Sequence, residues 1–222
     1  MGSCRGGRAL LGALALLVAL GLGAPRPVPA ERAATQPRKL ERGILLVASR
    51  QITGPFFAKT VVLLIEYGPG GALGLILNRP TRVGLEELLP EVAASGDPGE
   101  PIYFGGPVDR SALMVLVRSA TAPPHSRPIV ADLFATGSRE TLKGLLSSES
   151  GATTFRVFVG SAGWAPGQLD HERARGDWFL APVEPDVILG DGAKDLWPEL
   201  IQRYEGIEVD RGRRSPIVDA SG

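Results

Sequence analysis

The nearest approach to a catalytic motif in the sequence is the segment GSAG at residues 160–163. A nucleophile elbow has the spacing GxSxG, and its first glycine would here have to be Val159. A serine hydrolase also needs a histidine base, and the chain offers only His125 and His171. The failed spacing argues against this reaction class, and we expect no catalytic residues.

Three potential metal ligands follow one another at Asp170, His171 and Glu172. Neighbouring helix residues point about 100° apart, so the three cannot bind one ion together. The pattern favours a solvated helix face. The glycine-rich residues 68–74 lack GxGxxG spacing and join two strands, and the sequence contains no P-loop motif. We therefore expect neither a metal nor a cofactor.

The composition excludes a general electrostatic attraction to nucleic acid. The chain has 222 residues, with 24 basic and 24 acidic side chains and 44% hydrophobic residues. No segment combines a basic stripe with stacking aromatic residues, so there is no clear nucleic-acid signature. The length fits one compact domain with additional segments.

Residues 1–30 are typical of a signal peptide. Arg5 and Arg8 precede an apolar run at residues 9–22, which is shorter than the roughly 20 residues of a membrane-spanning helix. Val28 and Ala30 suit signal peptidase, which predicts cleavage after Ala30 and a periplasmic or envelope location. Cleavage would remove Cys4, the single cysteine. An uncleaved membrane anchor and a cytosolic protein with misread upstream sequence stay open.

The remaining chain divides into three parts. Residues 31–42 are polar and charged, which predicts a mobile linker. Residues 43–205 contain the apolar runs of the folded domain. Residues 206–222 are rich in charged residues, glycine and serine, which predicts a flexible, solvated C-terminal tail.

Short apolar runs predict a β-sheet. Residues 44–48, 61–65 and 73–77 are continuously apolar, which is typical of strands that are covered on both faces. The stretch YGPGG at residues 67–71 has the chemistry of a hairpin turn, so the strands on either side should be antiparallel. Further strands are expected at residues 102–104, 113–117, 154–159 and 178–180.

Helical patterns are shorter and come between the strands. One helix is expected at residues 85–89, a second at 138–146 with Ser138 as its cap, and a third at 168–175, which ends before Gly176. A last helix from Asp191 to Tyr204 should bend or restart at Pro198. The lack of a regular strand–helix alternation favours an α+β fold.

Two segments are not explained by secondary structure alone. The first is Gly54–Phe57, followed after a strand and a turn by Asn78-Arg79-Pro80. The second is residues 160–170, with Trp164 inside it and Trp178 after it. Glycines let a backbone pass close to a bulky group, and the tryptophans provide that bulk. These tryptophans could face a ligand, or they could pack at the sheet end with their N–H groups bound nearby.

The sequence resembles the YqgE/AlgH family of bacterial proteins. The resemblance runs in order from Gly43 to Tyr204, and its most specific pieces are residues 71–80 and 163–169. Further matches are GILLVA at 43–48, PFF at 55–57, TVVLL at 60–64, GGP at 105–107, Trp178 and Ala181-Pro182. The sequence departs from the family pattern at Gly54, Tyr67 and Arg173, where members usually have Asp, His and Leu.

The family resemblance implies an α+β fold with a strongly bent, largely antiparallel sheet that forms a pseudo-barrel flanked by short helices. It brings no established catalytic residues. Some members have been proposed as regulators of gene expression, and most members look cytosolic.

These patterns favour a non-enzymatic ligand- or partner-binding or regulatory module. Its partner would be a small ligand, a protein or a peptide, and it would meet a membrane only through an uncleaved N-terminal segment. A cytosolic transcriptional regulator and a hydrolase that uses Ser161 or Asp170 are the alternatives. The predicted binding residues lie at the ends of strands, where pockets tend to form. They are Pro55, Phe56, Asn78, Arg79, Gly105, Gly106, Trp164, Gln168 and Trp178.

Overall fold

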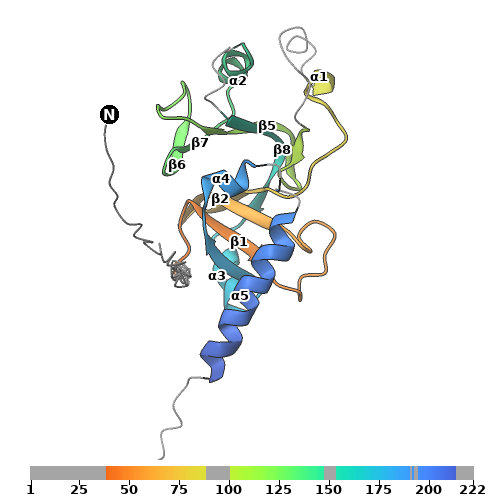
Figure 1. The fold of residues 1–222 in the computed structure, drawn as a ribbon, viewed down its shortest axis with the longest axis vertical. Helices are drawn as coiled ribbons and strands as arrows, with labels where there is room; N and C mark the ends of the chain where they lie inside the picture. The colour runs from red at the N-terminus through yellow and green to blue at the C-terminus, as the bar shows by residue number, and fades with distance from the viewer. Residues whose placement is uncertain (1–38, 89–100, 148–153, 191, 193–194, 214–222) are drawn as a thin grey trace, which may run out of the picture. The chain divides into compact units, whose positions relative to one another are not determined.

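The computed structural model describes residues 39–88, 101–147, 154–190, 192 and 195–213, with side chains up to Glu205. The described strands are β1 (Ile44–Ala48), β2 (Val61–Gly68), β3 (Gly71–Ile76), β4 (Tyr103–Phe104), β5 (Val108–Arg118), β6 (Arg127–Val130), β7 (Leu133–Thr136), β8 (Thr154–Trp164) and β9 (Trp178–Pro182). They form one sheet in the order β6-β7-β5-β8-β3-β2-β1-β9, and β4 pairs with β8 (Figure 1). Every pair is antiparallel except β4 with β8, so the largely antiparallel sheet is confirmed.

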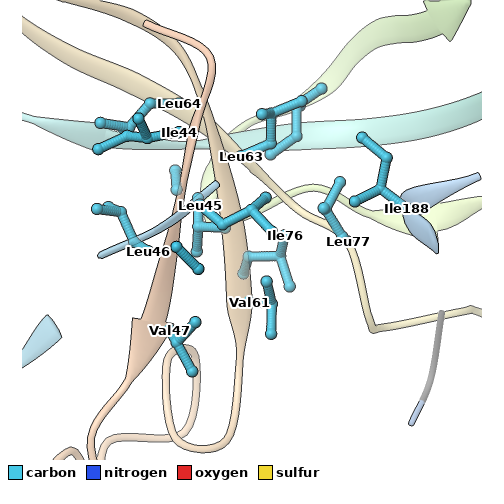
Figure 2. Close-up of a cluster of buried hydrophobic side chains, with 14 of the residues drawn as sticks. Ile44, Leu45, Leu46, Val47, Val61, Leu63, Leu64, Ile76, Leu77 and Ile188 are labelled. Atoms are coloured by element: carbon cyan, nitrogen blue, oxygen red, sulfur yellow. The ribbon is translucent and has the colours of Figure 1, made fainter. Parts of the chain in front are cut away.

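The continuous apolar runs form the most deeply buried strands. Every residue of β1 is buried, as are the first five residues of β2. Figure 2 shows side chains of these two strands gathered with Ile76, Leu77 and Ile188. The predicted hairpin is confirmed, because β2 and β3 pair antiparallel and Gly68 lies opposite Gly71.

Strand β8 joins the two parts of the sheet. Its first half pairs with β5 on one side and, through Phe158 and Val159, with β4. Its last residues, from Ala162 to Trp164, pair with β3 instead. Gly160 lies between these halves with φ of 70°, a left-handed conformation that glycine adopts without steric strain.

The sheet curls until strands distant in its order come close together. A Cβ atom on Gly43, the residue before β1, would lie 2.9 Å from the carbonyl oxygen of Ile129 in β6. Arg127 of β6 also forms an ion pair with Glu66 of β2. Because β6 and β1 are far apart in the strand order, these contacts require strong curvature. The expected pseudo-barrel is therefore confirmed.

Five described helices accompany the sheet: α1 (Leu85–Leu88), α2 (Arg139–Leu146), α3 (Gln168–Ala174), α4 (Pro185–Ile188) and α5 (Leu196–Arg213). The predicted cap of α2 is confirmed, because the Ser138 side chain accepts the backbone N–H of Thr141 at 3.1 Å. Helix α5 packs on β1 and β9, and Trp197 Nε1 donates to the carbonyl of Ala48 at 2.7 Å. Among the described residues, no helix has the length and apolar character needed to cross a bilayer.

Several boundaries differ from the sequence-based expectation. Strands β6 and β7 and helix α4 were not predicted. Leu40, assigned to the mobile linker, is only 4% exposed and belongs to the main core cluster. Helix α5 continues to Arg213 instead of ending at Tyr204, so the first residues of the predicted tail are helical.

The last helix starts two residues before Pro198, close to the predicted restart. Helix α5 begins at Leu196, which puts Pro198 in the first turn, where its missing N–H would have no helical partner. The proposed cap Asp191 lies outside the described residues, as do the predicted signal segment 1–30, the linker before Lys39 and the end of the tail.

Candidate functional site

Asn78 follows β3 and fixes the end of the loop that joins β1 to β2. Its Oδ1 accepts the backbone N–H of Val61 at 3.0 Å, and its Nδ2 donates to the carbonyl of Lys59 at 2.9 Å. Lys59 has φ of 58°, a conformation that is uncommon for residues other than glycine. The Asn78 side chain therefore stabilises a strained turn directly before β2.

Arg79 holds the same loop further from the sheet. Its Nη1 donates to the carbonyl of Pro55 at 2.9 Å, and its Nη2 donates to the carbonyl of Ala58 at 3.1 Å. Partial burial lowers the pKa of the Arg79 guanidinium, yet an arginine remains charged because its ordinary pKa lies far above neutrality. The planar guanidinium thus binds two carbonyls of the loop with charge-assisted hydrogen bonds.

Phe57, in the same loop, packs against the two predicted tryptophans. Its ring centroid lies 6.0 Å from that of Trp164 and 5.9 Å from that of Trp178. The two indoles lie 6.1 Å apart with an interplanar angle of 79°, which is an edge-to-face contact. Trp164 is 6% exposed and Trp178 4%, so both serve mainly as packing residues.

Glu172 of α3 binds both indoles. Trp164 Nε1 and Trp178 Nε1 each donate to its Oε2 at 2.9 Å. Gln168 Nε2 donates to the other oxygen, Oε1, at 2.9 Å, and Gln168 Oε1 accepts the backbone N–H of Ala165 at 3.0 Å. The tryptophans therefore pack with their N–H groups bound nearby. This is the second of the two alternatives, packing at the sheet end instead of facing a ligand. The predicted solvated helix face is wrong for Glu172.

Gly105 and Gly106 mark the place where the chain after β4 crosses β8. A Cβ atom on Gly105 would lie 2.3 Å from the carbonyl oxygen of Gly160, and one on Gly106 would lie 2.3 Å from backbone atoms of Ser161. Gly105 is also bonded through its backbone to β3 and β8, at Ile76 and Val159. Both glycines are buried, and the structure uses their small size for this close approach.

Phe56 is the large apolar residue of the predicted set that is exposed. It is 44% exposed, and its ring lies 6.4 Å from that of Phe104 at an interplanar angle of 29°. The guanidinium of Arg110 lies 5.9 Å from the centroid of Phe104. The backbone of Phe104 is bound to Arg79, the residue that holds the loop, because the Phe104 N–H donates to the Arg79 carbonyl at 2.8 Å.

The structure thus arranges the nine predicted residues in two groups. Pro55, Phe56, Asn78 and Arg79 lie in or against the loop between β1 and β2, and Gly105 and Gly106 follow Phe104 beside it. Trp164, Gln168 and Trp178 meet at Glu172. Phe57 connects the groups, so Arg79 and Gln168 are linked through the loop and the aromatic cluster.

The sequence model of a family described as AlgH-like matches residues 45–208. The chain belongs to this family. A UPF0301 protein of Streptomyces coelicolor is 36% identical over 170 residues, which cover 74% of this chain and 86% of the relative. Another UPF0301 protein, from Chlorobium luteolum, is 32% identical over 180 residues and covers 81% of this chain and 93% of the relative.

Solved structures of two proteins have the same fold as this AlgH-like chain. A protein from Corynebacterium diphtheriae matches with a TM-score of 0.64 and 26% identity, covering 74% of this chain and 87% of that protein. The AlgH protein from Pseudomonas aeruginosa matches with a TM-score of 0.61 and 25% identity, covering 78% and 93%. The α+β class and the family resemblance are confirmed.

The hairpin of the AlgH-like chain forms a depression of about 400 Å³. It is lined by Glu66, Tyr67, Gly68, Gly70, Gly71, Ala72, Leu73 and Trp164. Trp164 is the one member of the predicted set among these residues. The Tyr67 hydroxyl at this depression donates to Asp170 Oδ1 at 2.7 Å, and this hydrogen bond to a carboxylate raises the pKa of Tyr67.

The alternative catalytic groups of this AlgH-like chain do not assemble in its described residues. No hydrogen bond there joins Ser161 to either histidine, and Asp170 is engaged by Tyr67. His125 is exposed and lies 3.9 Å from Glu140 on α2. The described residues also hold no group of three or more His, Cys, Asp or Glu side chains suited to a metal ion.

Three residues that shape this region were not predicted to do so from the sequence. They are Phe104, Arg110 and Glu172. Glu172 follows Gln168 by four residues on a helix, and this spacing puts the two side chains on one face. That spacing was a usable signal. The contact between Phe104 and Phe56 had none, because it depends on how β4 and the distant loop meet in the curled sheet.

Proposed function

We propose that this AlgH-like chain is a non-enzymatic module that binds another protein through the loop between β1 and β2. The observation that carries this proposal is Phe56, which is 44% exposed in a loop that is otherwise fixed to the sheet. Exposed aromatic side chains are enriched in the centres of protein interfaces. Pro55 beside it is exposed as well.

The loop is fixed before any partner binds. Arg79 binds its carbonyls at Pro55 and Ala58, and the backbone N–H of Ala58 donates to the carbonyl of Gly54 at 3.0 Å. Phe57 anchors it on the tryptophan pair. A preorganised surface loses little conformational entropy on binding, which favours affinity. The other predicted residues then act as the support of Phe56.

A non-enzymatic role is supported by the way polar groups are used. Glu172 accepts hydrogen bonds from two tryptophans and Gln168, and Asp170 accepts one from Tyr67. Carboxylates engaged in this way serve to position structure. A regulatory role would follow from the identity of the bound protein.

Affinity capture with paired variants tests the proposal. The chain is used as bait in wild-type form, as Phe56→Ala and as Val187→Ala, which truncates another exposed apolar residue, 39% exposed on α4. We expect a protein that is retained by the wild type and Val187→Ala and lost by Phe56→Ala. Direct binding of that purified protein must show the same ranking. Equal binding to all three baits would contradict the proposal.

Activity profiling tests the hydrolase alternative. Ester and phosphoester panels are applied to the wild type, Ser161→Ala and Asp170→Asn. We expect no turnover above that of buffer. Turnover that disappears in one of these variants would establish an enzyme and overturn the non-enzymatic assignment. Salt-sensitive binding to duplex DNA would instead support the cytosolic regulator.

We also propose that the chain is exported to the periplasm or cell envelope. The support is the basic–apolar–small pattern of residues 1–30, with cleavage expected after Ala30. Cell fractionation followed by N-terminal sequencing should find a mature protein that begins at Glu31. A cytosolic protein that retains Met1 would contradict export.

A further inference from the structure

We infer that the Phe56 region binds an acidic protein segment that carries a large apolar side chain. The inference rests on the proposed function and adds the chemistry of the partner. The region is defined by Phe56, Phe104 and Arg110 and is called the Phe56–Phe104 surface below. It joins the loop after β1 to β4 and to the start of β5.

The apolar part of the surface is the pair of stacked phenylalanines. Phe56 is 44% exposed, and its ring stacks on that of Phe104 with the centroids 6.4 Å apart. Val108, 47% exposed, begins β5 four residues after Phe104, and a Cβ atom on Gly163 would lie 3.3 Å from its Cγ2. Phe56 and Val108 are two of the three large apolar residues that are exposed in the described chain, and Val108 lies in the segment that follows Phe104.

The cationic part of the surface is Arg110. It is exposed, and within the described residues it forms no ion pair. The adjacent carboxylate of Asp109 accepts the hydroxyl of Ser111 at 2.9 Å. Arg110 instead places its guanidinium near the ring of Phe104. An arginine in this position keeps its charge available for a carboxylate of a partner.

The two parts together indicate the occupant. A large apolar side chain can pack on the exposed ring of Phe56, while a carboxylate nearby in the same segment pairs with Arg110. Charge complementarity selects an acidic segment over a basic one, because a basic segment would bring a like charge to Arg110. Arginine and aromatic residues also dominate the binding energy of many protein interfaces.

Single-stranded nucleic acid is the other ligand class that combines aromatic rings with cations. It needs a basic groove that follows several phosphates in succession. The surface offers one cation, Arg110, and the carboxylate of Asp109 lies between Val108 and Arg110 in the chain. This charge pattern favours a peptide over a polyanion.

Selection from a random heptapeptide display library on the full chain tests the inference. We expect the enriched peptides to carry Asp or Glu within two positions of an aromatic or large aliphatic residue. Synthetic fluorescent copies are then titrated by anisotropy. Binding should weaken at least about tenfold in Phe56→Ala and in Arg110→Glu, as expected for residues at the centre of an interface.

Two variants elsewhere serve as controls. Val187→Ala removes exposed apolar surface from α4, and Arg139→Glu reverses an exposed charge at the start of α2. Both should bind within about twofold of the wild type, as surface changes away from the site do. A peptide in which Lys replaces the acidic residue should recover binding to Arg110→Glu. That charge exchange separates recognition from a general loss of folding.

Several results would overturn the inference. They are enrichment of no peptide, enrichment of basic peptides, equal binding to all variants, or binding of oligo-dT that depends on Phe56. A captured protein that needs Phe56 but tolerates Arg110→Glu would leave the proposed function intact and refute the acidic partner. A protein that binds equally well to the wild type, Phe56→Ala and Arg110→Glu would refute both the proposed function and the acidic partner.

Discussion

At the scale of single residues, several conspicuous side chains stabilise the fold through hydrogen bonds within the molecule. Glu172 accepts hydrogen bonds from two tryptophans, and Arg79 and Asn78 bind the carbonyls of a loop. Sequence alone showed that Asn78, Arg79 and the tryptophans were unusual. It could not show that their polar atoms are used within the molecule, because those partners lie far away in the chain.

Glu172→Ala should destabilise the chain by about 2–4 kcal/mol. The substitution leaves two buried indole N–H donors without their acceptor, and each such loss costs about 1–3 kcal/mol. Urea unfolding followed by tryptophan fluorescence measures the change. Glu87→Ala, at an exposed position on α1, is the control and should change stability by less than about 0.5 kcal/mol. Equal stability of the two variants would contradict the role of Glu172.

Tyr67→Phe should reduce stability by less than about 1 kcal/mol, because its hydrogen bond to Asp170 is solvent-accessible. The bond raises the pKa of Tyr67, so its stabilisation is fully present below the pKa of an unfolded tyrosine. It is lost as pH rises through the folded pKa. The difference between wild type and variant should therefore be constant near neutrality and shrink in strong alkali.

Phenolate absorbance during an alkaline titration measures the same effect. The component that disappears in Tyr67→Phe should titrate above the ordinary range of tyrosine. A component that titrates at or below that range would contradict the bond between Tyr67 and Asp170.

At the scale of elements, the apolar runs predicted most of the sheet. Strand β1 occurs as expected. Its residues are all buried, and a short, continuously apolar run is typical of a strand that is covered on both faces. Strand β6 was missed because Arg127 and Pro128 are exposed and proline weakens a strand pattern. Helix α4 has only four residues, too few for a helical period to be recognised.

Arg79 holds the outer part of the loop between β1 and β2. Arg79→Lys removes the planar fork that binds the carbonyls of Pro55 and Ala58, and a lysine ammonium cannot replace it. We expect amide hydrogen exchange in residues 54–59 to accelerate at least about tenfold, as a loss of about 1.4 kcal/mol of local stability implies. Arg82→Lys, at an exposed position, should leave this exchange unchanged. Equal amide exchange rates at residues 54–59 in both variants would contradict the role of Arg79 in holding the loop.

At the scale of the whole molecule, the curled sheet brings distant segments together. The crossing of residues 105–106 over β8 needs glycine, because side-chain atoms would overlap the backbone of Gly160 and Ser161. The sequence pattern placed these glycines among the predicted ligand-binding residues. The strand order that puts another segment of the chain there cannot be read from local patterns.

Two glycine substitutions should therefore have opposite effects. Gly106→Ala forces a Cβ atom to within 2.3 Å of the backbone at Ser161, and we expect a loss above about 3 kcal/mol or failure to fold. Gly144→Ala, in α2, meets nothing within 4 Å and should stabilise the chain by about 0.5–1 kcal/mol through helix propensity. Thermal unfolding of both variants decides between this account and a ligand role for Gly106. A Gly106→Ala variant as stable as the wild type would contradict the close approach of residues 105–106 to β8.

The most direct test of a protein-binding surface on this molecule is its footprint in solution. Isotope-labelled chain is titrated with a peptide selected on it, and backbone amide shifts are followed by NMR. The account predicts changes at residues 54–59 and 104–110, with little change along α5. Changes confined to the hairpin depression at residues 66–73, or to α5 and β9, would contradict it.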